Sequence, residues 1–288
     1  MLEKITPLVL TYNEAANIGR TLEQLRWAKD IVVVDSFSND QTLEIAGSFP
    51  HVRVFEREFD THEQQWNFGL SETGISSEWV LALDADYVLT EEFSAELRTL
   101  PAPAAISGYR ARFIYCINGK RLKSGVYPPV TVLYRRDRAG YEQDGHTHRV
   151  NVSGRIENLS APILHDDRKP LARWLETQSR YTRLEANKLL SAKASELSWT
   201  DRVRGWRLVA PAAMLVYCLI IRGGVLDGWA GFYYAFQRSL AELMLALYLI
   251  DHDLGPKAFR AARAVAGETP AVPAEVEIRN SKSAIRNS

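Results

Sequence analysis

Two aspartates one residue apart, Asp84 and Asp86, directly follow the apolar run Trp79–Leu83. The run is typical of a buried strand, and positions i and i+2 of an extended segment point to the same side. Two carboxylates at such a strand end provide hard oxygen ligands, which suit Mg²⁺ or Mn²⁺ together with substrate phosphate oxygens. The pattern alone is weak evidence, because solvated aspartates also end many strands.

Polar residues also follow the two predicted strands at 5–10 and 31–34. They are Thr11, Tyr12, Glu14 and Asp35. Ligands of parallel sheets bind beyond the carboxyl ends of the strands, so these residues and the two aspartates should converge on one crevice. Tyr12 is suited to stack on a base, while Glu14 and Asp35 are suited to accept hydrogen bonds from a base or ribose. The alternative for Asp35 is a structural turn or helix cap.

These residues require a particular arrangement of elements. Further strands are expected at 52–55 and 79–83, and helices at 14–25, 42–46 and 64–70. Strands that alternate with helices imply βαβ units and a mostly parallel sheet, so we expect an α/β fold. Shorter strands are expected at 107–114, 130–134 and 150–156. From Pro170 onward the pattern is helical.

One histidine, His165, follows the apolar pair Ile163-Leu164 and precedes the charged run Asp166–Lys169. At a strand end its imidazole is suited to contact a diphosphate or a metal ion, and Arg168 is suited to pair with a phosphate oxygen. The alternative is a structural histidine that hydrogen-bonds its neighbours.

The charge of the chain is balanced, with 35 Lys and Arg against 35 Asp and Glu, so it gives no indication of nucleic-acid binding. Residues 168–207, however, hold ten Lys or Arg against four Asp or Glu. The two cysteines stand in unrelated contexts, which fits a reducing compartment. The first residues lack the apolar stretch of a secretion signal, so we expect a cytoplasmic protein.

The C-terminal half combines this basic character with apolar segments at 208–221 and 239–250. Both are shorter than the roughly 20 apolar residues that a membrane span requires. Cations and tryptophans beside short apolar helices suit the membrane interface, although a helical subdomain packed on the sheet explains them equally well. We expect a catalytic domain over 1–166, a helical region at the membrane interface over 167–266 and a disordered tail over 267–288.

Four motifs occur in one order along the first half of the chain. They are Thr11-Tyr12-Asn13-Glu14, Asp35-Ser36-Phe37-Ser38-Asn39-Asp40, Gln64-Gln65-Trp66-Asn67 and Asp84-Ala85-Asp86. In this order they resemble the inverting family-2 glycosyltransferases with the GT-A fold. Later segments around His148–Gly154, His165 and Arg222–Gly231 look like the branch of β-glucosyltransferases that act on the lipopolysaccharide core or other bacterial envelope glycans. The resemblance covers about residues 4–252.

This resemblance implies a nucleotide-sugar donor such as a UDP-hexose, and an acceptor that is a lipid-linked or envelope saccharide. It implies that Asn67 contacts the base or ribose, that Asp84 lies near the ribose, and that Asp86 holds the Mg²⁺ or Mn²⁺ that bridges the diphosphate. Trp66 stands where relatives often carry Lys or Arg, and Tyr87 where many carry an acidic residue. Both departures would make the site less charged.

Glycosyl transfer by inversion also requires a base that takes the proton of the acceptor hydroxyl. Relatives of this branch carry Glu after a His, and alignment on Gly154 puts Thr147 and His148 at these positions. An imidazole can act as a base at neutral pH, so His148 is the first candidate. Asp144 and His146 are alternatives from the same loop, and the histidines could also assist the metal or belong to a solvated turn.

We therefore expect a metal-dependent inverting glycosyltransferase at the inner face of the cytoplasmic membrane, attached to its anionic surface by the helical region. Two alternatives remain open. One is a nucleotidyltransferase, although residues 10–19 contain one glycine and lack its usual glycine-rich phosphate loop. The other is a non-catalytic nucleotide-sugar-binding or scaffold protein, which the departures at Trp66, Tyr87 and His148 favour.

Overall fold

The computed structural model describes residues 1–101, 103–144, 147–193, 195 and 197–255. Its centre is a seven-stranded mixed sheet with strand order β12-β6-β9-β4-β1-β2-β3. The bounds of these strands are β1 (Ile5–Thr11), β2 (Ile31–Asp35), β3 (Val52–Glu56), β4 (Trp79–Asp84), β6 (Ile106–Ala111), β9 (Val130–Arg135) and β12 (Arg155–Asn158). The part from β4 to β3 is parallel, while β9 runs antiparallel to both β4 and β6. The sheet confirms the expected α/β class.

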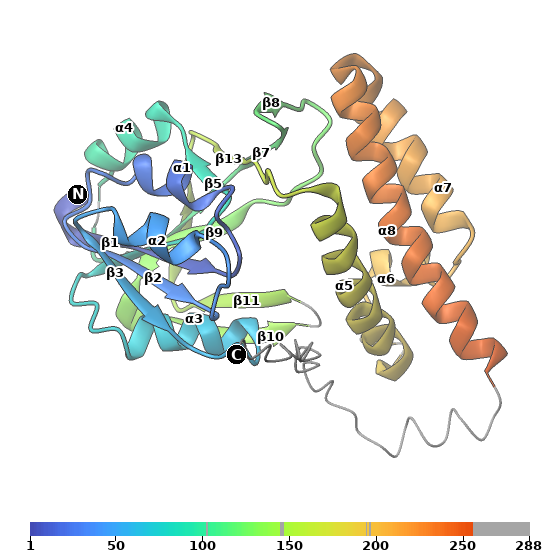
Figure 1. The fold of residues 1–288 in the computed structure, drawn as a ribbon, viewed down its shortest axis with the longest axis horizontal. Helices are drawn as coiled ribbons and strands as arrows, with labels where there is room; N and C mark the ends of the chain where they lie inside the picture. The colour runs from blue at the N-terminus through green and yellow to red at the C-terminus, as the bar shows by residue number, and fades with distance from the viewer. Residues whose placement is uncertain (102, 145–146, 194, 196, 256–288) are drawn as a thin grey trace, which may run out of the picture.

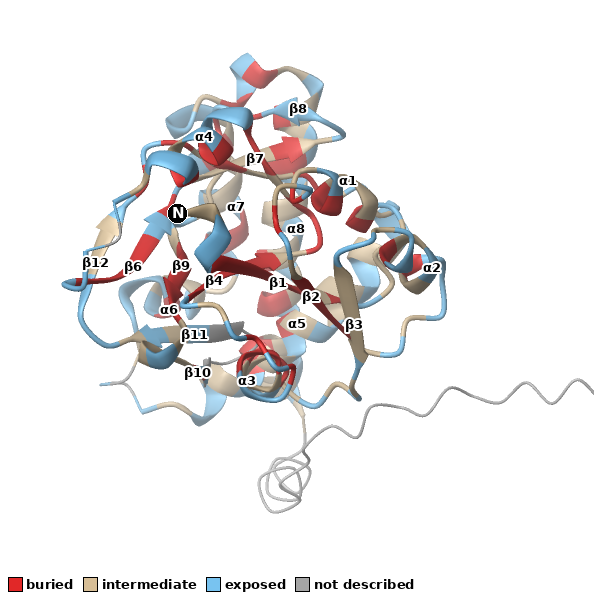
Figure 2. Cartoon of the chain, turned by 90° about the vertical axis from the view of Figure 1, so that its left-hand side faces the viewer, coloured by how far each residue is buried: buried red, intermediate tan, exposed pale blue. Residues whose placement is uncertain are grey.

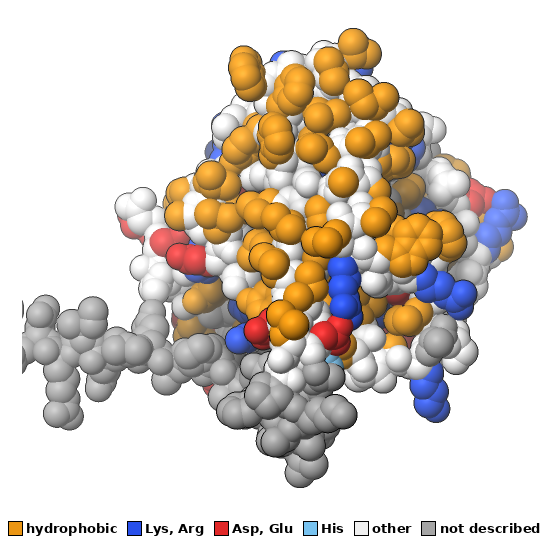
Figure 3. Space-filling model, turned by 90° about the vertical axis from the view of Figure 1, so that its right-hand side faces the viewer, with side chains coloured by type: hydrophobic (Ala, Val, Ile, Leu, Met, Phe, Trp, Pro, Cys, Tyr) orange, Lys and Arg blue, Asp and Glu red, His pale blue; other side chains and the backbone are white. Residues whose placement is uncertain are grey.

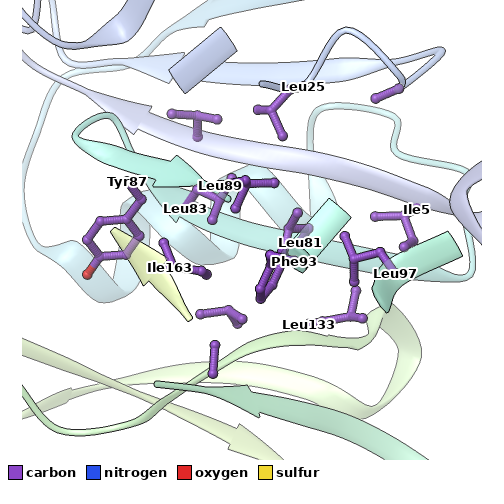
Figure 4. Close-up of a cluster of buried hydrophobic side chains, with 14 of the residues drawn as sticks. Ile5, Leu25, Leu81, Leu83, Tyr87, Leu89, Phe93, Leu97, Leu133 and Ile163 are labelled. Carbon is purple, nitrogen blue, oxygen red and sulfur yellow. The ribbon is translucent and has the colours of Figure 1, made fainter. Parts of the chain in front are cut away.

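Alternate residues of the central strands feed two separate cores, as the two-residue period of a strand requires. One core joins Val33 and Leu81 to helices α1 (Ile18–Glu23), α2 (Thr42–Gly47) and α4 (Glu91–Thr99), and Figure 4 shows part of it around Leu83, Phe93 and Leu97. The other core joins Leu8 and Val80 to α3 (His62–Ser71). Helices therefore cover both faces, and β1, β2 and β4 are buried between them (Figure 2).

Two smaller sheets complete the strand-rich part of the molecule. The hairpin of β10 (Ala139–Asp144) and β11 (Thr147–Val152) lies beside α3 (Figure 1). A four-stranded sheet has the order β5-β13-β7-β8. Its strands are β5 (Tyr87–Leu89), β7 (Phe113–Ile117), β8 (Lys120–Arg121) and β13 (Ile163–His165). This sheet places His165 opposite Tyr87, directly after the Asp-x-Asp segment.

Most of the remainder of the described chain is helical and lies beside the strand-rich part, at the right of Figure 1. They are α5 (Leu171–Ser191), α6 (Trp199–Arg204), α7 (Val209–Val216), a π-helical turn η3 (Tyr217–Ile221), η4 (Gly224–Asp227) and α8 (Trp229–Leu254), besides the 3-10 turns η1 (Leu2–Lys4) and η2 (Arg136–Arg138). Helix α8 packs against both α5 and α7. None of the helices described here has the length and apolar character needed to cross a membrane.

Most expected elements are present, with three differences. The helix expected at 14–25 covers only Ile18–Glu23, and a turn in which the Asn17 N–H donates to the Glu14 carbonyl precedes it. The strand expected at 107–114 is two strands, β6 and β7, and that expected at 150–156 is broken by Gly154, whose φ is +118°. The expected tail at 267–288 lies outside the described residues.

The close approach of α3 to β1 gives a stability test. A Cβ on Gly69 would lie 2.8 Å from both methyl carbons of Leu8 in the sheet core. We expect Gly69→Ala to lower the free energy of unfolding by about 1–3 kcal/mol through overpacking. Gly47, also helical, has open space at its Cβ position, so Gly47→Ala should be neutral or stabilising by up to about 1 kcal/mol. Urea unfolding of both variants measures the difference, and equal effects would contradict this packing.

Candidate active site

The register of three parallel strands places their polar ends at one edge of the sheet. Thr11 of β1 pairs with Asp35 of β2, and the preceding residue Leu10 pairs with Asp84 of β4. The expected convergence of these strand ends is therefore present. In an open α/β sheet this edge is where ligands bind.

Asp35 is fully buried and organises the loop that follows β2. Its carboxylate accepts hydrogen bonds from the Thr11 hydroxyl (2.7 Å), the Ser38 N–H (2.7 Å) and the Ser38 hydroxyl (2.6 Å). Ser38 in turn accepts the N–H of Asn13 at 2.7 Å. These bonds join the loops after β1 and β2. They agree with the alternative in which Asp35 is a structural turn residue. A contact from Asp35 to a base or ribose stays a prediction.

Tyr12 and Asn67 lie in different surroundings. Tyr12 is 43% exposed, and the guanidinium of Arg173 stands 5.3 Å from the centre of its ring. Such an exposed aromatic ring beside a cation can receive a base. The Asn67 amide instead donates to the carbonyl and accepts from the N–H of Tyr141, both at 3.0 Å. In this structure it fastens α3 to β10, so its expected contact with the nucleotide would compete with these two bonds.

Asp86, which is buried, pairs with the half-buried His165, whose Nε2 lies 3.1 Å from Oδ2 of Asp86. Burial raises the pKa of Asp86, but the charge and hydrogen bond of His165 outweigh burial and hold it below its usual range. Burial lowers the pKa of His165, but Asp86, with smaller contributions from Asp84 and Asp167, outweighs burial and raises this pKa. The other oxygen of Asp86, Oδ1, is buried and has no hydrogen-bond partner among the described residues. A buried carboxylate oxygen without a partner is costly unless a ligand completes it.

Asp84 lies only two residues from Asp86, but its pKa is shifted in the opposite direction. Burial and then the negative charge of Asp86 raise the pKa of Asp84 to about 6. Neighbouring carboxylates with different pKa values are common at functional sites. Here the two negative charges repel each other, and a bound cation would relieve this repulsion. Within the described ranges, no cluster of three or more His, Cys, Asp or Glu could by itself hold a metal ion. An ion at Asp86 would take further ligands from substrate or water.

The charged run after β13 supplies a second cation, Lys169, for which the sequence predicted no role. Lys169 contacts the carboxylate of Glu14 and lies 3.7 Å from Asp167. Burial lowers the pKa of Lys169, but Glu14, Asp167 and Asp86 together outweigh burial and raise it. Burial also raises the pKa of Glu14, to about 7, with a smaller contribution from Asp86. Glu14, expected to contact the base or ribose, is thus held at the rim beside the carboxylate pair.

Asp166, in the same run, forms ion pairs with Arg20 of α1 and with Arg168. Its carboxylate lies 2.8 Å from Arg20 and 2.9 Å from Arg168, and it accepts the Gly119 N–H at 2.9 Å. Arg168, the expected phosphate contact, is 43% exposed in its side chain and keeps donors free for a ligand. The run of two acids and two bases directly after a strand is the sequence signal that could have pointed to Asp166 and Lys169 as well.

Tyrosines surround His165. The rings of Tyr87, Tyr115 and Tyr127 lie 5.3, 4.7 and 4.9 Å from the imidazole, and the hydroxyls of Tyr87 and Tyr127 are 2.6 Å apart. Tyr87, noted above as a departure from the family pattern, therefore has a structural explanation here. It forms one wall of the enclosure that orients His165 toward Asp86.

The three candidate bases cannot be placed. His146 lies outside the described residues. Asp144 ends β10 and His148 belongs to β11, where their backbones pair with Thr147 and Gln143. Their side chains are likewise outside the described part, so the identity of the base stays a prediction.

A cavity of 530 Å³ lies beside this edge of the sheet. Asp84 and Tyr87 line it together with Trp66 and Tyr127, and residues of α5, α6 and α8 form its opposite wall. Asp35 and Asp86 do not line this cavity, so Asp84 is the member of the carboxylate pair that borders it.

The family described as Glycosyl transferase family 2 matches this chain over residues 8–150. An uncharacterized glycosyltransferase of Rickettsia felis is 33% identical over 260 residues, which cover 83% of this chain and 88% of that protein. Another from Rickettsia bellii is 34% identical over 98 residues, or 34% of this chain and 32% of that protein. Among solved structures, residues 1–349 of S. aureus TarS in complex with UDP-GlcNAc give a TM-score of 0.41 at 16% identity, covering 87% of this chain and 91% of that chain.

Asp84→Asn should change how stability depends on pH. The folded pKa of Asp84, about 6, is raised above the unfolded value of about 3.9, so the folded state binds this proton more tightly. The free energy of unfolding of wild-type protein should therefore fall as pH rises from about 4 to about 6, and the variant should lose this fall. Urea titrations in EDTA measure both curves, and parallel curves across the window would contradict the assignment.

Proposed function

The chain belongs to glycosyl transferase family 2 and is a glycosyltransferase with a GT-A-like α/β fold, and we propose that it moves a hexose from a UDP-sugar to an envelope glycan. The observation that carries the donor assignment is the buried, unpartnered Oδ1 of Asp86 beside Asp84 at the carboxyl edge of the parallel strands. Membership of the family removes the nucleotidyltransferase and scaffold alternatives.

The donor nucleotide would lie across the joined loops after β1 and β2. Tyr12 offers an exposed ring for the base, and the Thr11–Asp35 pair lies beneath. The diphosphate would face Arg168 and Lys169, whose positive charges stabilise the leaving nucleoside diphosphate. Both cations belong to the segment between β13 and α5 and are oriented by Asp166 and Asp167.

A divalent cation fits this site. The hard oxygens of Asp84 and Asp86, with Oδ1 of Asp86 lacking a partner, match the ligand preference of Mg²⁺ or Mn²⁺, and His165 is a further candidate ligand. When bound, such an ion would neutralise charge that develops on the leaving diphosphate. The role of His165 in the structure described here is to hold the other oxygen of Asp86.

In the transfer step the acceptor hydroxyl oxygen forms a bond to the anomeric carbon as the bond from that carbon to the diphosphate breaks. The hydroxyl proton passes to a base, for which we propose His148, with Asp144 and His146 as alternatives.

A His148→Ala variant should lower the turnover number with donor affinity unchanged, and a wild-type rate would transfer the role to Asp144 or His146.

The acceptor is proposed to be a lipid-linked or envelope saccharide, as in the lipopolysaccharide-core branch, reached from the cytoplasmic face of the membrane. Support comes from an apolar face on α7, η3, η4 and the start of α8, where Leu226 and Trp229 are 83% and 87% exposed. Figure 3 shows hydrophobic side chains gathered over this face. At its border the Lys120 ammonium donates a hydrogen bond to the backbone carbonyl of Asp227, so a cation adjoins the apolar tip. Such a combination suits an anionic membrane surface.

The metal assignment predicts a specific defect in Asp86→Asn. With saturating Mn²⁺ and UDP-glucose, the variant should lose transfer or donor hydrolysis by at least about a hundredfold, since an interaction with transition-state charge is lost. Binding of UDP, measured by calorimetry, should weaken much less. Asp137→Asn, at an exposed position of η2, is the matched control and should behave as wild type. Equal activity of the two variants would refute the metal role.

The apolar face predicts salt-sensitive binding to vesicles. Full-length protein should sediment with vesicles of anionic phospholipid at low salt, and Trp229→Glu should weaken this association by about tenfold or more, because an exposed aromatic anchor is lost. Ala95→Glu adds the same charge on the exposed side of α4 and should leave binding unchanged. Absence of wild-type association at low salt would show that this face does not bind lipid.

A further inference from the structure

We propose that the 530 Å³ cavity between the sheet and helices α5 and α8 is the acceptor pocket, and that it receives an uncharged, hydroxyl-rich sugar ring. This inference rests on the proposed function, because it places the acceptor of that same reaction. The cavity begins at Asp84, beside the carboxylate pair, and extends to the buried charges of the helical region.

Two helices turn polar faces toward this space. Gln178, Tyr181, Thr182 and Glu185 line it from α5, and Arg238, Ala241, Glu242 and Leu245 line it from α8. Each set has the spacing i, i+3, i+4, i+7 of one helical face. A face that packs on a protein core is normally apolar, so two facing stripes that carry amide, hydroxyl and charged groups indicate a wall built for a polar occupant.

The charged groups at the far end are already organised. Arg204 lies 3.0 Å from Glu185 and 3.1 Å from Glu242, and both carboxylates are buried. Their remaining oxygen lone pairs can accept hydrogen bonds from hydroxyl groups. The Nε of Arg238 is buried and has no hydrogen-bond partner among the described residues. This N–H can donate to a sugar oxygen, and the pocket thus offers both acceptors and donors.

The charge balance identifies the class of ligand. Apart from Asp84, which the proposed cation would neutralise, Glu185 and Glu242 line the cavity together with Arg204 and Arg238, so the charges of the wall balance. A wall without surplus positive charge gives a phosphate or carboxylate no net attraction to offset its desolvation, whereas neutral hydroxyls carry no such cost. Toward the sheet the wall becomes aromatic and apolar, with Trp66, Tyr127 and Val130. Apolar rings beside a few polar groups suit the two kinds of surface that a sugar ring presents. An anionic or lipid part of the acceptor would remain outside the cavity.

Saturation-transfer NMR on the full-length protein tests this proposal without catalysis. The probes are methyl glycosides of glucose, galactose and mannose, compared with the corresponding hexose 6-phosphates. We expect saturation transfer to at least one neutral glycoside and none to the phosphates. Gln178→Ala removes a hydrogen-bonding group, and Ala241→Trp fills the cavity, so each should weaken the signal by about tenfold or more. Asn187→Ala removes an amide from the exposed side of α5 and should have no effect.

A thermal shift with UDP separates this inference from the proposed function. Wild type, Gln178→Ala, Ala241→Trp and Asn187→Ala should all be stabilised equally by UDP, which shows that the variants are folded and that the donor site is intact. No transfer from wild type to any neutral glycoside, unchanged signals in both cavity variants, or a preference for the phosphates would overturn the pocket assignment. Failure of UDP to bind wild type would instead refute the donor assignment.

Discussion

The parallel pairing of β1 with both β2 and β4 is the constraint on which the site depends. Because Thr11 stands opposite Asp35 and Leu10 opposite Asp84, the chain must leave all three strands at one edge of the sheet. The two cores on either face hold this register, since a slip by one residue would exchange their side chains. The loops that carry Glu14 and Asp86 are positioned from these strand ends.

The same arrangement also gathers several charged side chains at the carboxyl edge of the sheet, where they are largely shielded from water. Asp86 forms an ion pair with His165, and Glu14 forms one with Lys169. The pKa of Asp84 is raised, however, and Oδ1 of Asp86 has no hydrogen-bond partner among the described residues. Leaving charges incompletely paired in a buried place costs stability. A site that binds a cation together with a diphosphate would recover this cost on binding, which gives the arrangement a functional explanation.

The main elements of the catalytic half could be predicted because their physical signals are local. β-branched runs such as Ile31–Val34 mark buried strands, and the polar residue that follows each run marks the binding edge. The pairing of Glu14 with Lys169 could not be predicted, because it joins residues 155 positions apart through the placement of β13. The short strand Ile163–His165 has too few residues for a periodic pattern.

In the helical region, too, the sequence did not predict which residues come together. Its basic and apolar character was evident, but the polar stripes on α5 and α8 have meaning only once both helices face one cavity. Gln178 and Arg238 look like ordinary surface residues in the sequence. Docking of the helices against the sheet decides which of their faces meets solvent, and no local rule encodes this docking.

A crystal structure of the protein with UDP and Mn²⁺ would locate the ion and the diphosphate relative to Asp86. We expect an anomalous manganese peak within coordination distance of Asp86 Oδ1, shared with the diphosphate, and a uridine beside Tyr12. Manganese and diphosphate bound elsewhere, with Oδ1 of Asp86 still unoccupied, would contradict the metal assignment.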